Sequence, residues 1–221
     1  MKAVLKVGGS LAEYPSKLRN LCRKLALFAE DHNLLVVPGG GQFADAVRNV
    51  DKTYRLSSTI AHEMAILAMD QFGLFLSDIT PHSYVSYSME KVKNSASGAL
   101  PIFLPSRLIL GGDRFEPCWD VTSDSIAAYV ADIAHAEMLV LVTDVDGIFT
   151  ENPEKSLDAK LIPEVSVKQL LGWNKRTSVD RALPKTLLNT KLNCYVVNGK
   201  HPGRIKAILE RQESVYTHIT V

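Results

Sequence analysis

Two glycine clusters, each placed directly after a short apolar run, constrain the fold of this chain most strongly. The run AVLKV at 3–7 is followed by GGS at 8–10, and the run LLVVP at 34–38 is followed by GGG at 39–41. Between them, residues 16–32 repeat apolar side chains at the spacing of one helix face. Strand, helix and strand in direct succession predict two parallel strands joined by a crossover helix, with both glycine clusters at the carboxyl edge of the sheet.

The rest of the chain continues this alternation of apolar runs and helical periods. Helices are expected at 42–50, 57–72, 122–136 and 202–211, and strands at 102–105, in the first half of 138–147 and at 194–199. Residues 74–100 show no clear period. No repeat, low-complexity segment or linker interrupts the 221 residues, so we expect an α/β fold around a mostly parallel sheet.

Composition and charge exclude several classes of function. The chain is 46% hydrophobic and 22% charged, with a formal net charge of +1. Its overall charge therefore predicts neither a nucleic-acid partner nor a membrane partner. The three cysteines, Cys22, Cys118 and Cys194, are few, odd in number and far apart, so they imply neither a zinc site nor a disulfide framework. No apolar stretch approaches the ~20 residues of a membrane span, and we expect a cytoplasmic protein.

Glycines at the carboxyl edge of a parallel sheet have a chemical use, because ligands bind at that edge. Glycine lets the backbone approach an anion closely, and successive N–H groups form an anion-binding concavity. Lys6, beside the end of its expected strand, adds a positive charge. The pattern predicts one long polyanion or two phosphate-sized groups between the loops. The alternatives are tight strand-to-helix turns and a lysine that reaches solvent.

Acidic residues are expected near the same edge. The segment TDVDG at 143–147 follows an apolar strand, and Asp124 lies in the first turn of an expected helix. TDVDG would bind a metal or ribose hydroxyls, or it would cap a turn. Asp124 would complement the helix dipole, or it would hold a catalytic lysine in place.

Four motifs together resemble the amino acid kinase family. They are K-x-G-G-S, V-x-P-G-G-G-x-F, S-D-x-x-A-A and T-D-V-D-G-I-F-T-x-N-P, and they occur in the order found in that family over nearly the whole chain. The resemblance implies a single domain over residues 1–221, built as a three-layer α/β/α sandwich. It places the acceptor on the half of about 1–118 and ATP on the half of about 119–221. It also implies direct phosphoryl transfer and a homo-oligomer.

The resemblance assigns roles to individual residues of this sequence. Lys6 would stabilise the transferring phosphoryl group, and Asp124 would orient the lysines. The residues implied at the nucleotide are Gly8, Gly9 and Ser10 at the phosphates, with Thr143, Asp144, Asp146, Gly147 and Phe149 lining the rest of its site. The residues implied at the acceptor are Gly39, Gly40 and Gly41. Mg²⁺ follows from the use of ATP, and no residue is assigned to it as a ligand.

Two departures from the family pattern concern the nucleotide side. The family carries a second lysine preceded by a glycine–methionine pair, whereas this chain reads TSVDRALPK at 177–185 without that pair. Lys185 is the candidate for the second catalytic lysine, and the alternative is a helix lysine that faces solvent. The C-terminal glycine–threonine of the family is also absent.

The stretches GGGQFADAVR, WDVTSDSIAA and SVDRALPK look most like a branch of the family that acts in methanofuran biosynthesis. That branch phosphorylates [5-(aminomethyl)furan-3-yl]methyl phosphate to the diphosphate, which implies a small phosphomonoester as acceptor. Arg48 and Arg55 are candidates to contact its phosphate, and Asp45 or Asp51 to contact its amine. Trp119 would stack on the furan or on adenine, or it would pack in the core.

Other functions remain open at this point. The acceptor could instead be UMP, isopentenyl phosphate or an amino acid carboxylate. A non-catalytic nucleotide sensor is a different class, and Lys6, Asp124 and TDVDG count against it, because a sensor does not need groups that stabilise a transition state.

Overall fold

The computed structural model describes residues 1–94, 98–112, 115–173 and 177–221. Within these residues, eight strands form one sheet in the order β3–β4–β2–β1–β5–β9–β10–β8. The strands are β1 Ala3–Val7, β2 Leu34–Pro38, β3 Ser83–Ser86, β4 Leu100–Phe103, β5 Met138–Thr143, β8 Glu164–Ser166, β9 Asn193–Asn198 and β10 Thr217–Thr220. Neighbouring strands are parallel except for β9 and β10, which are antiparallel. The mostly parallel sheet predicted from the sequence is confirmed.

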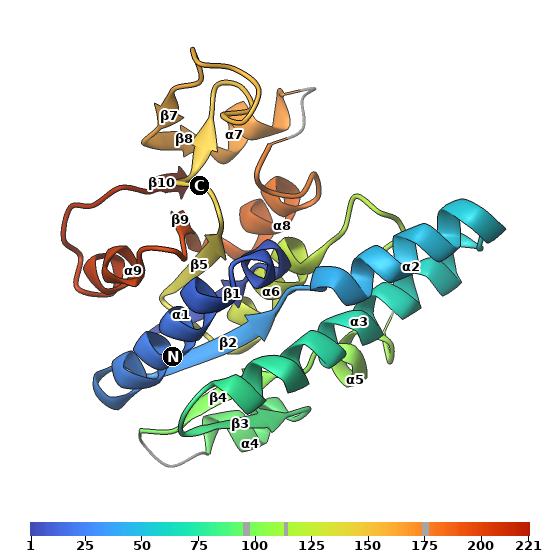
Figure 1. The fold of residues 1–221 in the computed structure, drawn as a ribbon, viewed down its shortest axis with the longest axis horizontal. Helices are drawn as coiled ribbons and strands as arrows, with labels where there is room; N and C mark the ends of the chain where they lie inside the picture. The colour runs from blue at the N-terminus through green and yellow to red at the C-terminus, as the bar shows by residue number, and fades with distance from the viewer. Residues whose placement is uncertain (95–97, 113–114, 174–176) are drawn as a thin grey trace.

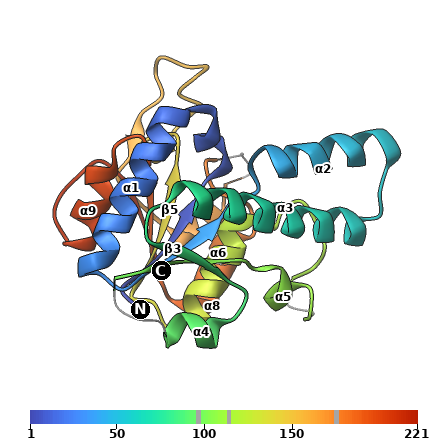
Figure 2. The same ribbon diagram turned by 60° about the horizontal axis from the view of Figure 1, so that its bottom comes forward.

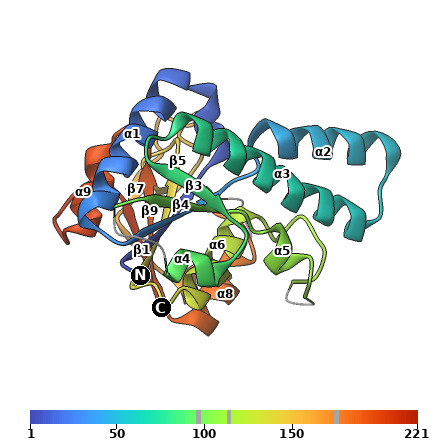
Figure 3. The same cartoon turned by 90° about the horizontal axis from the view of Figure 1, so that it is seen from below.

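Helices cover both faces of this sheet (Figure 1). They are α1 Pro15–Asp31, α2 Gly41–Tyr54, α3 Ser58–Ile79, α4 Met89–Lys93, α5 Ser106–Ile109, α6 Ser123–Ile133, α7 Val167–Leu171, α8 Leu183–Thr190 and α9 Pro202–Leu209, with the 3₁₀ helix η1 Gly9–Glu13. Helices α1 and α9 lie on one face, and α6 and α8 lie on the other (Figure 3). The three-layer α/β/α sandwich is confirmed.

The two faces of the sheet contribute to two separate apolar cores, because successive side chains of a strand point to opposite sides. In β1, Leu5 packs with α1 and α9, whereas Val4 packs with α6 and α8. Helix α3 contributes to both cores, through Phe72 on one side and Ile66 on the other. Because both faces of these strands are buried, their runs are apolar at nearly every position and not only at every second one.

Strand β1 is central and sets the geometry of the site. It pairs with β2 on one side and with β5 on the other, so that Lys6 lies opposite Val37 and Leu141. The carboxyl ends of these three strands therefore meet at one edge of the sheet. Both glycine clusters and the start of the segment 143–147 are brought together there, as the sequence predicts.

Helices α2 and α3 are longer than their sequence patterns indicated. They lie side by side as a pair that extends away from the sheet (Figure 2). Helix α2 ends at Tyr54 and is followed by Arg55, whose φ of 53° lies in the left-handed region. The side chain of Ser57 then accepts a hydrogen bond from the Ile60 N–H at the start of α3. The short turn between them fixes α2 as one wall above the glycine loops.

The C-terminal strand β10 and the two-stranded sheet of β6 Ile148–Phe149 and β7 Leu161–Ile162 were not predicted. Within the described residues, no helix combines the length and the apolar character that crossing a membrane requires.

Candidate active cleft

The two glycine loops contact each other at the carboxyl edge of the sheet. The Gly8 N–H donates to the Val142 carbonyl at 2.7 Å, and the Gly39 N–H donates to the Val7 carbonyl at 2.8 Å. A Cβ atom on Gly9 would lie 2.2 Å from the Cα of Gly41. Because no side chain fits between them, these loops present backbone to the space above, which is what a phosphate-binding surface requires.

Lys6 and Asp124 form an ion pair beneath these loops. The Lys6 Nζ lies 2.7 Å from Asp124 Oδ1, and their side chains are only 13% and 7% exposed. The other oxygen, Oδ2, accepts the backbone N–H of Asp180 at 3.0 Å. Removing two charges from water costs free energy, so a pair of this kind is a poor device for stability alone. Its place at the ligand-binding edge favours a role in chemistry.

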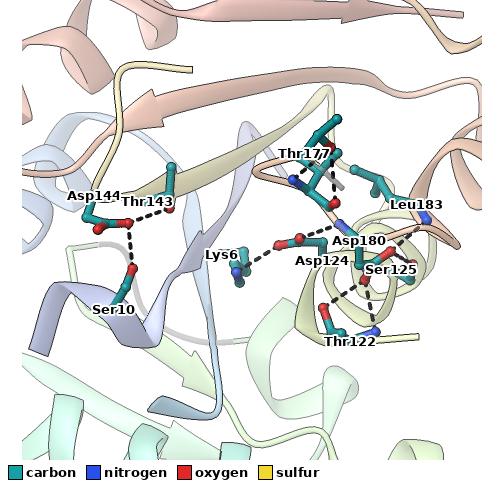
Figure 4. Close-up of polar contacts among 11 residues, drawn as sticks. Lys6, Ser10, Thr122, Asp124, Ser125, Thr143, Asp144, Thr177, Asp180 and Leu183 are labelled. Carbon is teal, nitrogen blue, oxygen red and sulfur yellow. Dashed lines mark hydrogen bonds and ion pairs between the residues drawn. The ribbon is translucent and has the colours of Figure 1, made fainter. Parts of the chain in front are cut away.

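Asp180 is a site residue that sequence reasoning missed. Figure 4 shows its carboxylate within a group of donors from the start of α6 and the start of α8. The donors are Thr122 N at 2.9 Å, Thr122 Oγ1 at 2.9 Å, Ser125 N at 3.0 Å, Ser125 Oγ at 2.5 Å and Leu183 N at 2.7 Å. Burial, followed by repulsion from Asp124, raises the pKa of Asp180. The sequence pattern that could have pointed to Asp180 is an aspartate just before a helix that carries proline in its first turn.

On the other side of Lys6, the first glycine loop is joined to the end of β5 (Figure 4). Ser10 Oγ donates to Asp144 Oδ1 at 2.8 Å, and Thr143 Oγ1 donates to the same oxygen at 3.2 Å. This contact links the KVGGS and TDVDG motifs directly, although they lie far apart in the sequence.

The remaining residues of the TDVDG segment make contacts away from Lys6. Asp146 pairs with Arg204 of α9 at 2.6 Å and accepts the Asn198 amide at 2.8 Å. Gly147 packs against β10, since a Cβ there would lie 2.4 Å from Thr217 Oγ1. These contacts attach the end of β5 to the C-terminal part of the sheet, so a structural role is sufficient to explain both residues.

A cleft of about 860 Å³ opens above the ion pair, within the range of about 300–1,000 Å³ typical of ligand pockets. It collects many of the predicted residues along its walls. Those that line it are Lys6, Gly8, Gly9, Ser10, Gly40, Gly41, Arg48, Asp124 and Thr143. Those that do not line it are Gly39, Arg55, Asp144, Asp146, Gly147, Phe149 and Lys185.

The two predicted cations outside the cleft lie on exposed surface. Arg55 follows the last turn of α2, and Lys185 lies on α8. Both stay predictions. Arg181, which the sequence did not single out, does line the cleft, and its Nη1 lies 3.9 Å from Asp120 Oδ1.

The α2 wall of the cleft carries a connected set of polar and aromatic groups. The Trp119 indole N–H donates to Asp51 Oδ2 at 2.9 Å. The Arg48 guanidinium lies 5.2 Å from the centre of the Trp119 ring and pairs with Asp45 at 2.7 Å. Trp119 is 37% exposed, so it packs at the cleft and not in the core. The wall therefore offers a ring face, carboxylates and a guanidinium to a bound molecule.

The donor set of the cleft suits a nucleotide better than a protein-held metal. Within the described ranges, no group of three or more histidine, cysteine, aspartate or glutamate side chains is placed to hold a metal ion. Glycine-loop backbone and Lys6 instead suit phosphate oxygens. Mg²⁺ would therefore enter with the nucleotide phosphates, as this ion commonly does.

Comparison with known proteins agrees with this geometry. Residues 1–198 match the model of the amino acid kinase family. The chain is 34% identical to the [5-(aminomethyl)furan-3-yl]methyl phosphate kinase of Methanocaldococcus jannaschii, over 98% of this chain and 96% of that protein. It is 29% identical to the uridylate kinase of Sulfolobus acidocaldarius, over 96% of each chain.

Solved structures show the same fold. The uridylate kinase of Archaeoglobus fulgidus superimposes with a TM-score of 0.77 at 22% identity, over the full length of both chains. The isopentenyl phosphate kinase of T. acidophilum superimposes with a TM-score of 0.66 at 22% identity, over 99% of this chain and 100% of that one. Motifs, fold and full-length similarity agree, and the chain belongs to the amino acid kinase family.

Proposed function

We propose that this protein is an ATP-dependent kinase that transfers the γ-phosphoryl group to a small phosphomonoester. The observation that carries the proposal is the buried Lys6–Asp124 pair beneath two contacting glycine loops, at the floor of a cleft of about 860 Å³. Phosphoryl transfer asks the protein chiefly for alignment and for positive charge around the transferring group. Lys6 and the loop N–H groups supply both.

The roles follow from the position of each group. The loop 8–10 holds the ATP phosphates, with Ser10 fixed by Asp144. The loop 39–41 faces the acceptor, and Lys6 lies between the two and stabilises the charge that moves from one to the other. Asp124 keeps the Lys6 ammonium in that position. The acceptor half is about 1–118 and the nucleotide half about 119–221.

The acceptor we favour is [5-(aminomethyl)furan-3-yl]methyl phosphate. The relative that is 34% identical over nearly the whole chain is named as the kinase of this compound. A small side pocket of about 40 Å³ lies next to Gly40. Its apolar lining consists of Ala44, Ala65, Ile66, Met69, Val121 and Ile126. His62 also lines it, and burial lowers the pKa of that imidazole. The volume of this pocket is well below the ~150 Å³ of a cavity that holds a benzene ring, so the choice of acceptor rests on the similarity to that relative.

Charged groups of the main cleft match the phosphate and the amine of that acceptor. Arg48 lines both the side pocket and the main cleft and can approach a phosphate. Asp45 and Asp51 line the main cleft and can pair with a primary amine. We infer a phosphorylated, amine-bearing ring compound as substrate and its diphosphate as product.

The test is ADP release from Mg·ATP with four acceptors: the aminomethylfuran phosphate, UMP, isopentenyl phosphate and acetylglutamate. The expected result is a kcat/KM that is highest for the furan phosphate and falls strongly in Lys6→Ala. A higher kcat/KM with UMP would support the kinase activity but contradict the furan phosphate as the acceptor. ATP binding without turnover on any acceptor would favour a nucleotide sensor.

We also propose that the protein is a cytoplasmic homo-oligomer. Ile60, Leu67 and Leu74 are 46%, 46% and 50% exposed and recur every seven residues along α3, so they share one helix face. An apolar face of this kind is suited to self-association. Light scattering of wild type and of Leu67→Glu tests the oligomer, and a monomeric wild type would reject it.

A further inference from the structure

The loop before α8 is attached to the start of α6 through one buried side chain. Asp180 lies 55 to 58 residues away in sequence from the Thr122 and Ser125 groups that it binds. It also accepts the Leu183 N–H at the first residue of α8. One carboxylate therefore joins the ends of two helices that border the cleft.

This carboxylate occupies a position that an anionic ligand would otherwise prefer. The N–H groups at a helix start attract negative charge. At α6, Thr122 N and Ser125 N are already bound by Asp180. Phosphate groups of a substrate are thus directed to the glycine loops and to Lys6 instead of to these two donors.

The attachment also fixes a second carboxylate. The Asp180 backbone N–H donates to Asp124 Oδ2 at 3.0 Å, while Asp124 Oδ1 lies 2.7 Å from the Lys6 Nζ. The orientation of the Asp124 carboxylate therefore depends on where the backbone of residue 180 is held. The side chain of Asp180 holds that backbone through its donors on α6 and α8 (Figure 4).

We infer that Asp180 is a positioning residue that fixes the Asp124 carboxylate and, through it, the ammonium of Lys6. The inference rests on the proposed kinase function. Asp180 lines the cleft, but both of its carboxylate oxygens accept donors from the starts of α6 and α8 and neither pairs with Lys6. Its effect on phosphoryl transfer is transmitted through Asp124.

The matched substitution is Asp180→Asn, which keeps the shape of the side chain. Its amide has a single acceptor oxygen, whereas the carboxylate accepts N–H groups at both oxygens, from Ser125 on Oδ2 and from Leu183 on Oδ1. At least one of these N–H groups loses its acceptor. We expect kcat to fall about tenfold to hundredfold, because small displacements of a catalytic group cost that much. KM for both substrates should change less than about twofold, because the glycine loops are untouched.

A double-mutant cycle separates positioning from general damage. If Asp180 acts through Asp124, Asp180→Asn will have little further effect on kcat in an Asp124→Asn background. Equal fold-losses in both backgrounds would overturn the inference. The control is Asp31→Asn, an exposed aspartate at the end of α1, which should leave kcat unchanged. If Asp180→Asn fails to fold, Ser125→Ala replaces it, because this variant removes only the Ser125 Oγ donor to Asp180. The same double-mutant cycle with Asp124→Asn and the same criterion then apply.

A second readout does not depend on kinase activity. The rate at which an amine-acylating reagent modifies Lys6, followed by mass spectrometry at fixed pH, reports how firmly Asp124 holds the ammonium. We expect this rate to rise severalfold in Asp180→Asn and in Asp124→Asn, but not in Asp31→Asn. An unchanged rate in Asp180→Asn would overturn the inference. If the wild type transfers no phosphoryl group, the proposed function fails, and the labelling still decides the role of Asp180.

Discussion

Gly9 and Gly41 approach so closely that a Cβ on Gly9 would lie 2.2 Å from both the Cα and the N of Gly41. Gly9 follows β1 and Gly41 begins α2, so this contact joins the two loops that we assign to nucleotide and acceptor. Gly41 also has a φ of +52°, in the region where side chains are rarely found. The contact brings the two anion-binding surfaces as close as backbone atoms allow.

The first prediction tests that contact. Gly9→Ala should lower the free energy of unfolding by about 1–3 kcal/mol, because the loops must separate to admit the methyl group. It should also weaken ATP binding. Gly203→Ala in α9 is the matched control: a Cβ there meets nothing within 4 Å, and the added methyl should be neutral or slightly stabilising. Urea unfolding and calorimetric titration with ATP measure both effects, and equal behaviour of the two variants would contradict the packing argument.

The second prediction concerns Lys6. Lys6→Ala should lower kcat by ~10²–10³ with the fold intact, as expected when one electrostatic contact to the transferring group is removed. Lys24→Ala, at an exposed position of α1, should leave kcat unchanged. Steady-state kinetics with circular dichroism on the same samples measure the change. Unaltered turnover in Lys6→Ala would remove Lys6 from the mechanism.

The third prediction compares two candidates for a second positive charge. Arg181 lines the cleft, whereas Lys185 is exposed on α8 outside it. We therefore expect Arg181→Ala to lower kcat at least about tenfold. This loss is smaller than the one expected for Lys6, because the Arg181 side chain is 67% exposed. Lys185→Ala should stay within about twofold of wild type. The reverse order of effects would restore Lys185 to the role that the family resemblance gives it.

The central strands and their ligand-binding edge could be predicted because the evidence for them is local. In β1, β2 and β5 apolar residues occupy nearly every position, and glycine or polar residues follow at once. Lys6 and Asp124 could be predicted as candidates for the same reason. Their pairing depends on β1 and α6 lying together, which no local pattern contains. The sequence offered it as one of two alternatives for Asp124, and the family resemblance favoured it.

The parts that were missed depend on long-range contacts. The role of Asp180 arises from donors 55 to 58 residues away, which no short pattern contains. The strand β10 has four residues, and its place between β9 and β8 is set by pairing alone. Lys185 was chosen from the family resemblance, as the lysine of the segment 177–185. It lies exposed on helix α8, and its role stays a prediction.

The fourth prediction concerns pH. Burial, the largest single influence on Asp146, raises its pKa, but the hydrogen bonds from Asn198 and Arg204 and the charge of Arg204 together lower it. A lowered native pKa stabilises the fold above the ordinary aspartate pKa of about 3.9, and this contribution is lost as pH falls through the native value. Asp146→Asn should therefore reduce stability at pH 7 and less so in acid.

The size of that effect should be below about 1 kcal/mol, because the Asp146 side chain is 37% exposed and water screens the pair. Urea unfolding between pH 7 and pH 3 measures it, with Asp158→Asn, at an exposed position, as control. A stability difference between wild type and Asp146→Asn that stays constant over this range would contradict the assignment.

The most direct test of the central claim is ³¹P NMR of the reaction of Mg·ATP with [5-(aminomethyl)furan-3-yl]methyl phosphate. Transfer of the γ-phosphoryl group to the acceptor phosphate predicts loss of its single resonance. Two coupled resonances of a new diphosphate should replace it, together with ADP, in the wild type and at a greatly reduced rate in Lys6→Ala. An unchanged acceptor resonance, with ATP intact or hydrolysed to inorganic phosphate, would contradict the account.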